Sequence, residues 1–337
     1  MADGTREGPA PKAISRDRPN ARLPRVASLV RILCLSRNAN LYSTRRLAAE
    51  AKALGHDFRV IDPVKCQITI DRDEPLIHHE GKRLPPADVV IPRIGASITT
   101  YGLAVVNQFE MMGTAIVNRS QAIARARDKL RAGQLLARHG IDTPRTVFLR
   151  SPKNLALAVE IVGGVPCITK LTQGTQGVGV MLAESIKSLE SMLETFWAMG
   201  QDIIIQEFIK ESKGKDIRAF VIGNKVVSAM RREAQLGEFR SNIHRGGIGR
   251  PITLSPEYEK AALSATRVMG LQVAGVDLLI GKAGPKVIEV NASPGFEGLE
   301  RAVATKNVAR QFIEYAAQYA EKWAESTQSG ALLLVDS

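Results

Sequence analysis

Two apolar runs near the carboxyl end of the chain carry acidic residues where buried strands normally carry none. The runs span residues 276–280 and 287–291, and the segment between them reads Gly-Lys-Ala-Gly-Pro-Lys, a composition typical of a turn. A hairpin centred near Ala283 places Asp277 opposite Glu289. Because side chains alternate between the two faces of a strand, Asn291 shares the face of Glu289.

These three residues predict a site for a hard cation. Two carboxylates that face each other in a sheet repel, and a cation between them would remove that cost. An all-oxygen set formed by Asp277, Glu289 and Asn291 suits Mg²⁺, which usually keeps waters and also binds substrate phosphates. A surface hairpin with scattered charges is the alternative, and this stretch alone leaves both open.

Composition limits the classes of partner. The chain has 337 residues, enough for two or three domains, and a net charge of +12. Residues 1–30 hold six basic and three acidic residues, which leaves +9 for the rest and predicts a polyanionic partner: nucleic acid, nucleotide or an acidic peptide. The basic stretches lack interleaved aromatic residues, so stacking readout of single-stranded nucleic acid is not indicated.

Neither membrane insertion nor a disulfide framework is indicated. No apolar run approaches the roughly 18 residues that a membrane span needs. Cys34, Cys66 and Cys167 are scattered without metal-ligand spacing, which is typical of a reduced, cytoplasmic protein.

The first half of the chain predicts a small parallel sheet. Strands and helices alternate in the order β-α-β-β-α-β over residues 29–118, with Ser43 expected to cap the first helix, and such alternation is typical of a parallel sheet covered by helices. A single long helix is expected over residues 120–139. The second half mixes helices with hairpins, so the overall class is α/β with an α+β second half. The expected division is a disordered basic tail (1–29), an N-terminal α/β domain (30–120), a central domain (121–200), a C-terminal domain (201–326) and a tail (327–337).

A glycine-rich loop and the lysine before it indicate a phosphate site. Glycines 174, 177 and 179 leave backbone N–H groups open to a phosphate, and Lys170 ends the preceding strand. The loop lacks the Gly-Lys-Ser/Thr ending of a Walker A motif. A flexible hairpin without a ligand is the alternative.

Two further segments could complete a nucleotide site. The apolar strand that ends at Glu207 and Phe208 could present backbone groups to an adenine, and Asp216 beyond it could bind ribose hydroxyls. A basic run over residues 230–242 offers guanidinium groups for phosphate or carboxylate, with Ser241 and Asn242 adding neutral hydrogen bonds. A core strand meeting a solvated, charged loop is the alternative for both segments.

The order of these segments along the chain is more specific than any one segment, and it resembles that of a known superfamily. A strand lysine with a Gly-rich loop, an adenine-type strand, a basic loop and an oxygen-ligand hairpin together resemble the ATP-grasp superfamily, and within it the RimK family of ribosomal-protein glutamate ligases. The resemblance covers residues 30–325, with the first 29 residues outside it. The matching segments are 170–180, 208–218, 229–232, 237–242 and 289–295. The resemblance implies a three-domain ATP-grasp fold, with a parallel α/β domain, a small central lid domain and a C-terminal antiparallel sheet domain.

The resemblance also implies a role for individual residues. Lys170 would contact the ATP phosphates, with Lys129 as a further ATP contact, and Glu207 and Phe208 would hold the adenine largely through the backbone. Asp216 would bind the ribose. The nucleotide and acyl-phosphate site would be lined by Arg240, Ser241 and Asn242. Asp277 and Glu289 would hold one Mg²⁺ or Mn²⁺, and Glu289 with Asn291 a second. Arg240 and Asn291 are the expected catalytic residues.

The implied reaction is the ATP-dependent joining of a carboxylate to an amine through an acyl phosphate. Phosphoryl transfer needs positioning and charge neutralisation more than a protein nucleophile. The implied partners are ATP, L-glutamate and the acidic C-terminal tail of a small-subunit ribosomal protein, and the implied assembly is a homo-oligomer. Two alternatives stay open: a RimK-like ligase that joins glutamate or another amino acid to a small-molecule or carrier-protein acid, and a non-catalytic ATP-binding regulator.

Overall fold

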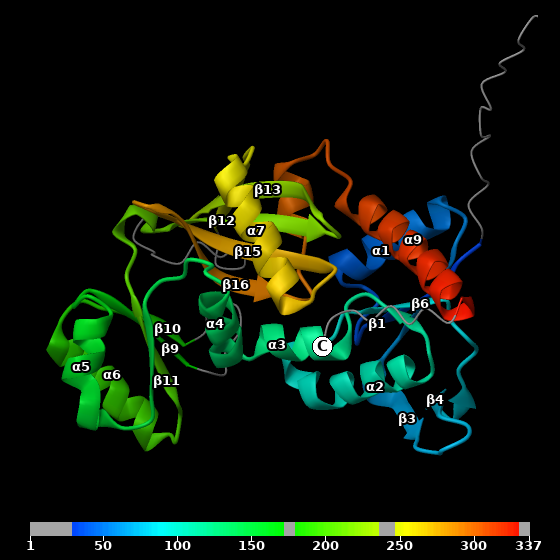
Figure 1. Cartoon of the computed structure of the whole chain (residues 1–337), viewed down its shortest axis with the longest axis horizontal. Coiled ribbons are helices and arrows are strands. Elements are labelled where there is room, and N and C mark those ends of the chain that lie inside the picture. Colours follow the sequence, from blue (N-terminus) through cyan, green and yellow to red (C-terminus); the bar gives the residue numbers. More distant parts are fainter. Residues whose placement is uncertain (1–28, 172–178, 236–246, 330–337) are drawn as a thin grey trace, which may run out of the picture.

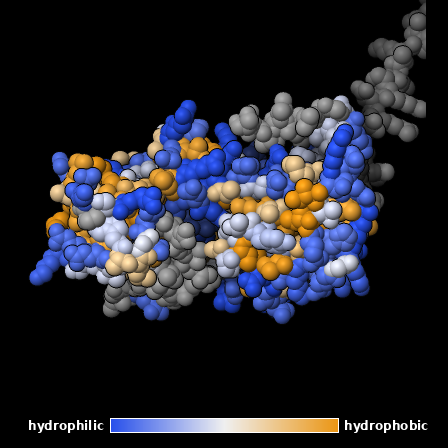
Figure 2. Space-filling model, turned by 90° about the horizontal axis from the view of Figure 1, so that it is seen from below, coloured by the Kyte–Doolittle hydropathy of each residue, from blue (hydrophilic) through white to orange (hydrophobic). Residues whose placement is uncertain are grey.

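The computed structural model describes residues 29–171, 179–235 and 247–329 (Figure 1). An N-terminal parallel sheet and a central antiparallel sheet lie at opposite ends of the molecule, and a larger antiparallel sheet lies between and above them (Figure 1). On the face seen from below, the surface is hollowed between the two ends, and hydrophilic residues line the hollow (Figure 2). No helix in these ranges is both long enough and apolar enough to cross a bilayer.

The N-terminal domain has the predicted parallel sheet. Its strand order is β2-β1-β6-β7, and all three neighbouring pairs are parallel. Its elements are β1 (Arg31–Leu35), α1 (Tyr42–Ala53), β2 (Asp57–Ile61), β6 (Val89–Pro92), α2 (Thr99–Met111) and β7 (Ala115–Ile116). A small antiparallel sheet that was not predicted follows β2, formed by β3 (Cys66–Thr69), β4 (Leu76–His79) and β5 (Lys82–Arg83).

The predicted cap of the first helix is wrong. Helix α1 begins one residue before Ser43 and has no side-chain cap. The Ser43 hydroxyl instead accepts a hydrogen bond from Arg93 over 2.9 Å, so a contact with a distant loop replaces the local one.

The long helix predicted over residues 120–139 is two helices, α3 (Ser120–Arg127) and α4 (Lys129–Arg138). Asp128 breaks the helix because its backbone is extended and its side chain accepts a hydrogen bond from the backbone of Arg131 over 2.9 Å, which caps α4. Both helices contact α7 (Pro256–Met269) of the C-terminal domain, although residues from 121 onward were predicted to belong to the central domain.

The central sheet is antiparallel, with strand order β10-β9-β11-β8. Its elements are β8 (Thr146–Leu149), α5 (Leu155–Ile161), β9 (Cys167–Leu171), β10 (Val180–Ala183), α6 (Ile186–Ala198) and β11 (Ile203–Glu207). Strand β11 lies between β9 and β8, so the central domain continues beyond the boundary predicted at residue 200. Ile203 and Ile205 explain this placement, because both are buried against Leu189 and Leu193 of α6.

The C-terminal sheet has the predicted antiparallel arrangement, with strand order β14-β13-β12-β15-β16. Its elements are β12 (Lys215–Ile222), β13 (Lys225–Glu233), β14 (Ile248–Pro251), α7 (Pro256–Met269), β15 (Val273–Gly281), β16 (Gly284–Asn291), α8 (Glu297–Ala302) and α9 (Val308–Gln328). Alternate residues of β12 face opposite sides. Ala219 and Val221 belong to the cluster with α7, whereas Phe220 and Ile222 belong to the cluster with α8 and α9. Helix α9 passes the tail boundary predicted at residue 327.

One buried amide joins the N-terminal domain to the C-terminal sheet. Asn118 follows β7, and its side-chain nitrogen donates to the carbonyls of Val273 and Ala292, both over 2.7 Å. Its oxygen accepts from the backbone N–H groups of Gln272 and Val273, over 2.7 and 2.8 Å. All four bonds reach the start of β15 or the end of β16, so they fix these ends of the hairpin against the parallel sheet.

Candidate active site

A cavity of about 620 Å³ opens between the central sheet, the C-terminal sheet and helix α4. Most of the described residues that were predicted as a nucleotide and metal site line it: Lys129, Lys170, Glu207, Phe208, Asp216, Asp277 and Glu289. They come from six different elements and from the segment after β11, so the fold brings together residues spread over 160 positions of the sequence.

The hairpin has the predicted register. Strands β15 and β16 pair with Asp277 opposite Glu289. The side-chain amide of Asn291 lies between Glu289 and Arg218. With its nitrogen toward Glu289, the amide donates to Oε1 over 3.1 Å, and its oxygen accepts from Arg218 Nη2 over 3.2 Å.

Two arginines neutralise Asp277. Arg218 donates to both carboxylate oxygens over 2.7 Å, and Nη2 of Arg232 lies 3.0 Å from Oδ2. Burial raises the pKa of Asp277, but the two guanidinium groups outweigh burial and hold the pKa below its usual range. On the Asp277 side, the two arginines therefore supply the positive charge that a metal cation was predicted to provide.

Glu289 has a different environment. Its side chain is exposed to the cavity, yet protein surrounds it on several sides. This partial burial and the nearby Asp277 carboxylate raise the pKa of Glu289, against the opposing effect of Arg218, Lys170 and Lys129. A carboxylate that is partly desolvated and faces a cavity favours a bound cation.

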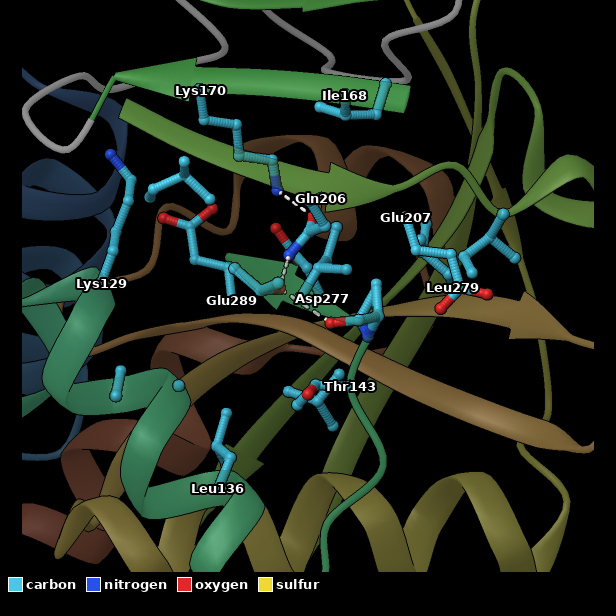
Figure 3. A pocket seen from close by; sticks show the side chains of 18 of the residues that line it. Lys129, Leu136, Thr143, Ile168, Lys170, Gln206, Glu207, Asp277, Leu279 and Glu289 are labelled. Atoms are coloured by element: carbon cyan, nitrogen blue, oxygen red, sulfur yellow. Dashed lines mark hydrogen bonds between the residues drawn. The ribbon is translucent and has the colours of Figure 1, made fainter. Parts of the chain in front are cut away.

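Two lysines approach the same space from the opposite wall (Figure 3). Lys170 of β9 donates to Gln206 Oε1 over 2.6 Å, and Lys129, the first residue of α4, donates to the carbonyl of Leu171 over 3.2 Å. Burial, together with the nearby Lys129, lowers the pKa of Lys170 to about 8, although Glu289 and Asp277 act to raise it. One wall of the cavity thus offers cationic groups to an anion, and the other offers oxygen ligands to a cation.

Family models match the chain on both sides of residue 125. A RimK-like ATP-grasp domain matches residues 126–316, and a RimK PreATP-grasp domain matches residues 30–123. The chain belongs to the RimK family. A protein of Vibrio vulnificus (strain YJ016) named probable alpha-L-glutamate ligase is 53% identical over 286 residues, covering 85% of this chain and 95% of its own length. A protein of Shewanella denitrificans named probable alpha-L-glutamate ligase 1 is 52% identical over 293 residues, covering 87% and 99%.

Solved structures share the fold of this RimK-family chain. The ATP-grasp ligase PsnB, in complex with a phosphomimetic variant of its minimal precursor, Mg and ADP, superposes with a TM-score of 0.68 at 22% identity, covering 86% of this chain and 98% of PsnB. D-alanine–D-alanine ligase of Bacillus anthracis in complex with ATP gives 0.64 at 18% identity, covering 88% and 99%. The predicted ATP-grasp fold and family are confirmed, and the chain is an ATP-dependent ligase.

The oxygen ligands of this RimK-family site fit a hard divalent cation. The described residues contain no cluster of three or more His, Cys, Asp or Glu side chains that could hold a metal, so a cation here would use two carboxylates and one amide. Oδ1 of Asp277 accepts one hydrogen bond, from Arg218, and keeps a second lone pair for a cation, whereas Oδ2 contacts both Arg218 and Arg232. Mg²⁺ completes such a set with waters and substrate phosphates. The sharing of Glu289 between two ions, with Asp277 on one and Asn291 on the other, stays a prediction.

The structure gives less support to the predicted ribose and adenine contacts. Asp216 lines the cavity, but both its carboxylate oxygens accept from Arg232, over 2.6 and 2.5 Å. The side chain of Glu207 is engaged with Arg145, whose backbone N–H donates to it over 3.1 Å. The ribose role of Asp216 and the adenine role of Glu207 and Phe208 stay predictions. Arg240, Ser241, Asn242 and residues 172–178 of the Gly-rich loop lie outside the described residues.

The roles of two side chains at the site were not predicted from the sequence. Arg218 contacts Asp277 directly, and Gln206 positions the Lys170 ammonium group. Arg218 interrupts the apolar run of residues 217–222, which was a usable signal, because a charge in a central strand normally has a partner. Arg232 was predicted to bind phosphate or carboxylate and binds the carboxylates of the protein itself.

The charge of Lys170 predicts a pH-dependent affinity for ATP. Because the pKa of Lys170 in the free protein is lowered to about 8, its positive charge is present below that pH and lost as the pH rises through it. We expect the dissociation constant of Mg-ATP to increase about tenfold between about pH 7 and about pH 9.5. Lys170→Arg keeps its charge throughout and should show a flat profile in the same calorimetric titration. Parallel profiles for the two proteins would contradict the phosphate role.

Proposed function

We propose that this RimK-family ligase adds L-glutamate to the C-terminal carboxylate of a small-subunit ribosomal protein, with ATP converted to ADP and phosphate. The names of its relatives support glutamate as the amine substrate. The proposed acceptor is part of the ribosome, so the proposal places the enzyme in the cytoplasm. A homo-oligomer is the proposed assembly, and the family resemblance is its only support.

The observation that carries the proposal is the pairing of opposite charges across one cavity. Lys129 and Lys170 face the Glu289 carboxylate within a space of about 620 Å³ (Figure 3). A metal-bound triphosphate has both properties that these walls require, because its oxygens suit the ammonium groups and its cation suits the carboxylates. An isolated phosphate would bring no cation to the Glu289 carboxylate.

The reaction follows in two balanced steps. A terminal oxygen of the acceptor carboxylate attacks the γ-phosphorus of ATP, the bond to the β-phosphate oxygen breaks, and ADP leaves. The amino group of glutamate then attacks the acyl carbon, the carbon–oxygen bond to phosphate breaks, an amide forms, and the amine loses its proton. Bound Mg²⁺ or Mn²⁺ would neutralise charge on the transferring phosphate. Lys129 and Lys170 would orient the phosphates, and Asn291 would hold the end of the hairpin in register with Glu289.

An acidic acceptor suits the charge of the protein. The chain carries +12 overall, +9 of it beyond residue 30, and each glutamate added would make the acceptor tail more negative. A positive field attracts such a tail over distances up to about the Debye length, roughly 8 Å at physiological salt. Acceptor binding should therefore weaken as the salt concentration rises.

Labelled L-glutamate identifies the acceptor. We expect incubation with Mg-ATP and purified small ribosomal subunits to label one ribosomal protein, with one ADP released for each glutamate joined. Mass spectrometry should place the added residues at its C-terminus. Label on a small molecule and on no protein would replace the ribosomal acceptor with a small-molecule acid. The Glu289→Gln protein is the control for contaminating ligases.

A further inference from the structure

The parallel sheet of the N-terminal domain has a point where its topology reverses. Strands β1 and β6 are adjacent and parallel, with Leu35 paired to Pro92. Strand β2 lies beyond β1 and β7 beyond β6, so the chain leaves these two strands in opposite directions. Open α/β sheets bind ligands in the crevice that such a reversal creates at the carboxyl ends of the strands.

Three arginines converge on this point, and we call Arg37, Arg93 and Arg127 the basic edge. Arg37 follows β1, Arg93 follows β6, and Arg127 ends α3. Every acceptor that the structure gives them is neutral: Ser97 Oγ for Arg37 over 3.5 Å, the Pro294 carbonyl and Ser43 Oγ for Arg93 over 2.9 Å each, and the carbonyls of Gly95 and Ile94 with Thr99 Oγ1 for Arg127.

The basic edge differs in this respect from other arginines of the same protein. Within the described residues none of its three members pairs with a carboxylate, whereas Arg46, Arg218 and Arg232 each do. Arg93 and Arg127 are half-buried, and burial without a counter-ion disfavours their charged form. An anionic ligand would offset that cost.

The start of helix α1 adds to the positive potential at the same edge. Helix α1 follows the loop that leaves β1, and neither a side-chain cap nor an acidic residue occupies its first turn. The amino end of a helix favours anions through its unpaired N–H groups and its dipole. Arg93 contacts Ser43 in this turn, so the helix end and the arginines form one continuous surface.

The basic edge contacts the segment that follows the β15–β16 hairpin, which carries the predicted metal ligands. Arg93 donates to the carbonyl of Pro294, and Ser293 Oγ donates to the carbonyl of Pro92 over 3.3 Å. These contacts lie two and three residues beyond Asn291. An anion held at the basic edge would therefore lie next to the end of the hairpin that carries Glu289.

We propose that the basic edge binds the two carboxylates of the incoming dicarboxylic amino acid and leaves its amino group directed toward the hairpin. Arg37 and Arg93 are the contact residues, and Arg127 is a positioning residue that holds the loop from Ile94 to Thr99. This assignment rests on the proposed function, because it takes L-glutamate as the amine substrate.

Arg37→Ala is the sharpest test, because Arg37 is exposed and its hydrogen bond to Ser97 is long, at 3.5 Å. We expect its KM for L-glutamate to rise at least about tenfold with kcat and the KM for ATP unchanged, and Arg37→Lys to recover part of the loss. With L-glutamine, which lacks the second negative charge, the increase should be smaller. Arg59→Ala is the matched control, since Arg59 is an exposed arginine of the same sheet that pairs with Asp57.

The possible outcomes distinguish a failure of the proposed function from a failure of the basic-edge assignment. A wild-type enzyme that joins no glutamate to any acceptor would overturn the proposed function. An active wild type whose Arg37→Ala variant keeps its KM for glutamate would overturn only the basic edge. If the KM for an acidic acceptor peptide rises instead, the edge binds the acceptor tail and the assignment to the free amino acid is wrong.

Discussion

Replacing Glu289 with glutamine is expected to abolish ligation and ADP release without unfolding the protein. The substitution keeps the shape of the side chain but removes the carboxylate that faces the cavity between Lys129 and Lys170. If Glu289 holds the cation that neutralises phosphate charge, as predicted, turnover should fall at least about a thousandfold.

The same substitution should not lower stability at neutral pH. The pKa of Glu289 is raised in the folded state, so the folded protein holds that proton more tightly than the unfolded chain does. Ionising Glu289 therefore costs folding free energy at pH values above its unfolded pKa, and glutamine removes this cost. The variant should be at least as stable as wild type at pH 7, and the difference should vanish below the unfolded pKa.

ADP release checks the predicted loss of turnover, and thermal unfolding of the same samples checks the predicted stability. Glu297→Gln is the control, because Glu297 is a half-buried glutamate of α8 whose ion pair, among the described residues, is with Arg301. Retained turnover in Glu289→Gln would contradict the metal role. A large loss of stability would contradict the environment assigned to the carboxylate.

Replacing Arg232 with methionine is expected to cause a large loss of stability. Arg232 is 3% exposed and lies between Asp216 and Asp277, which are buried as well. Removing it leaves Asp216 without its partner and Asp277 with Arg218 alone. Breaking a buried ion pair from one side costs about 3–5 kcal/mol, because a carboxylate remains desolvated and uncompensated.

Urea denaturation compares this variant with Arg231→Met. Arg231 is the neighbouring residue, but its side chain is 41% exposed and its partner Glu233 is 25% exposed, so its loss should cost about 0–1 kcal/mol. The arginines lower the pKa of Asp277, so its ionic stabilisation is present at neutral pH and lost in acid. The deficit of Arg232→Met should therefore shrink as the pH falls through the carboxylate range. Equal losses in the two variants would contradict the buried ion cluster.

The β15–β16 hairpin was predictable because the residues that determine its register lie close together in the sequence. Two runs with a period of two and a glycine-rich turn fix a register, and the register alone places Asp277 opposite Glu289. The same reasoning predicted hairpins in the second half of the chain, and β12 and β13 form one of them. It also gave the parallel sheet of the N-terminal domain, because alternating strands and helices leave few ways to arrange the chain.

Several of the errors concern pairings between distant segments. Strand β11 follows an apolar pattern that suits either neighbouring sheet, and only its burial against α6 places it between β8 and β9. The contact of Arg218 with Asp277 depends on the adjacency of β12 and β15, which no short motif specifies. Strand β5 is two residues long, so a sequence pattern cannot identify it.

The fate of one oxygen atom tests the acyl-phosphate mechanism most directly. An acidic peptide ending in glutamate, with its C-terminal carboxylate enriched in ¹⁸O, is incubated with the enzyme, Mg-ATP and L-glutamate. Transfer through an acyl phosphate predicts one ¹⁸O atom in inorganic phosphate for each amide formed, with ADP as the nucleotide product. Amide formation that releases unlabelled phosphate, or AMP and pyrophosphate, would contradict the account.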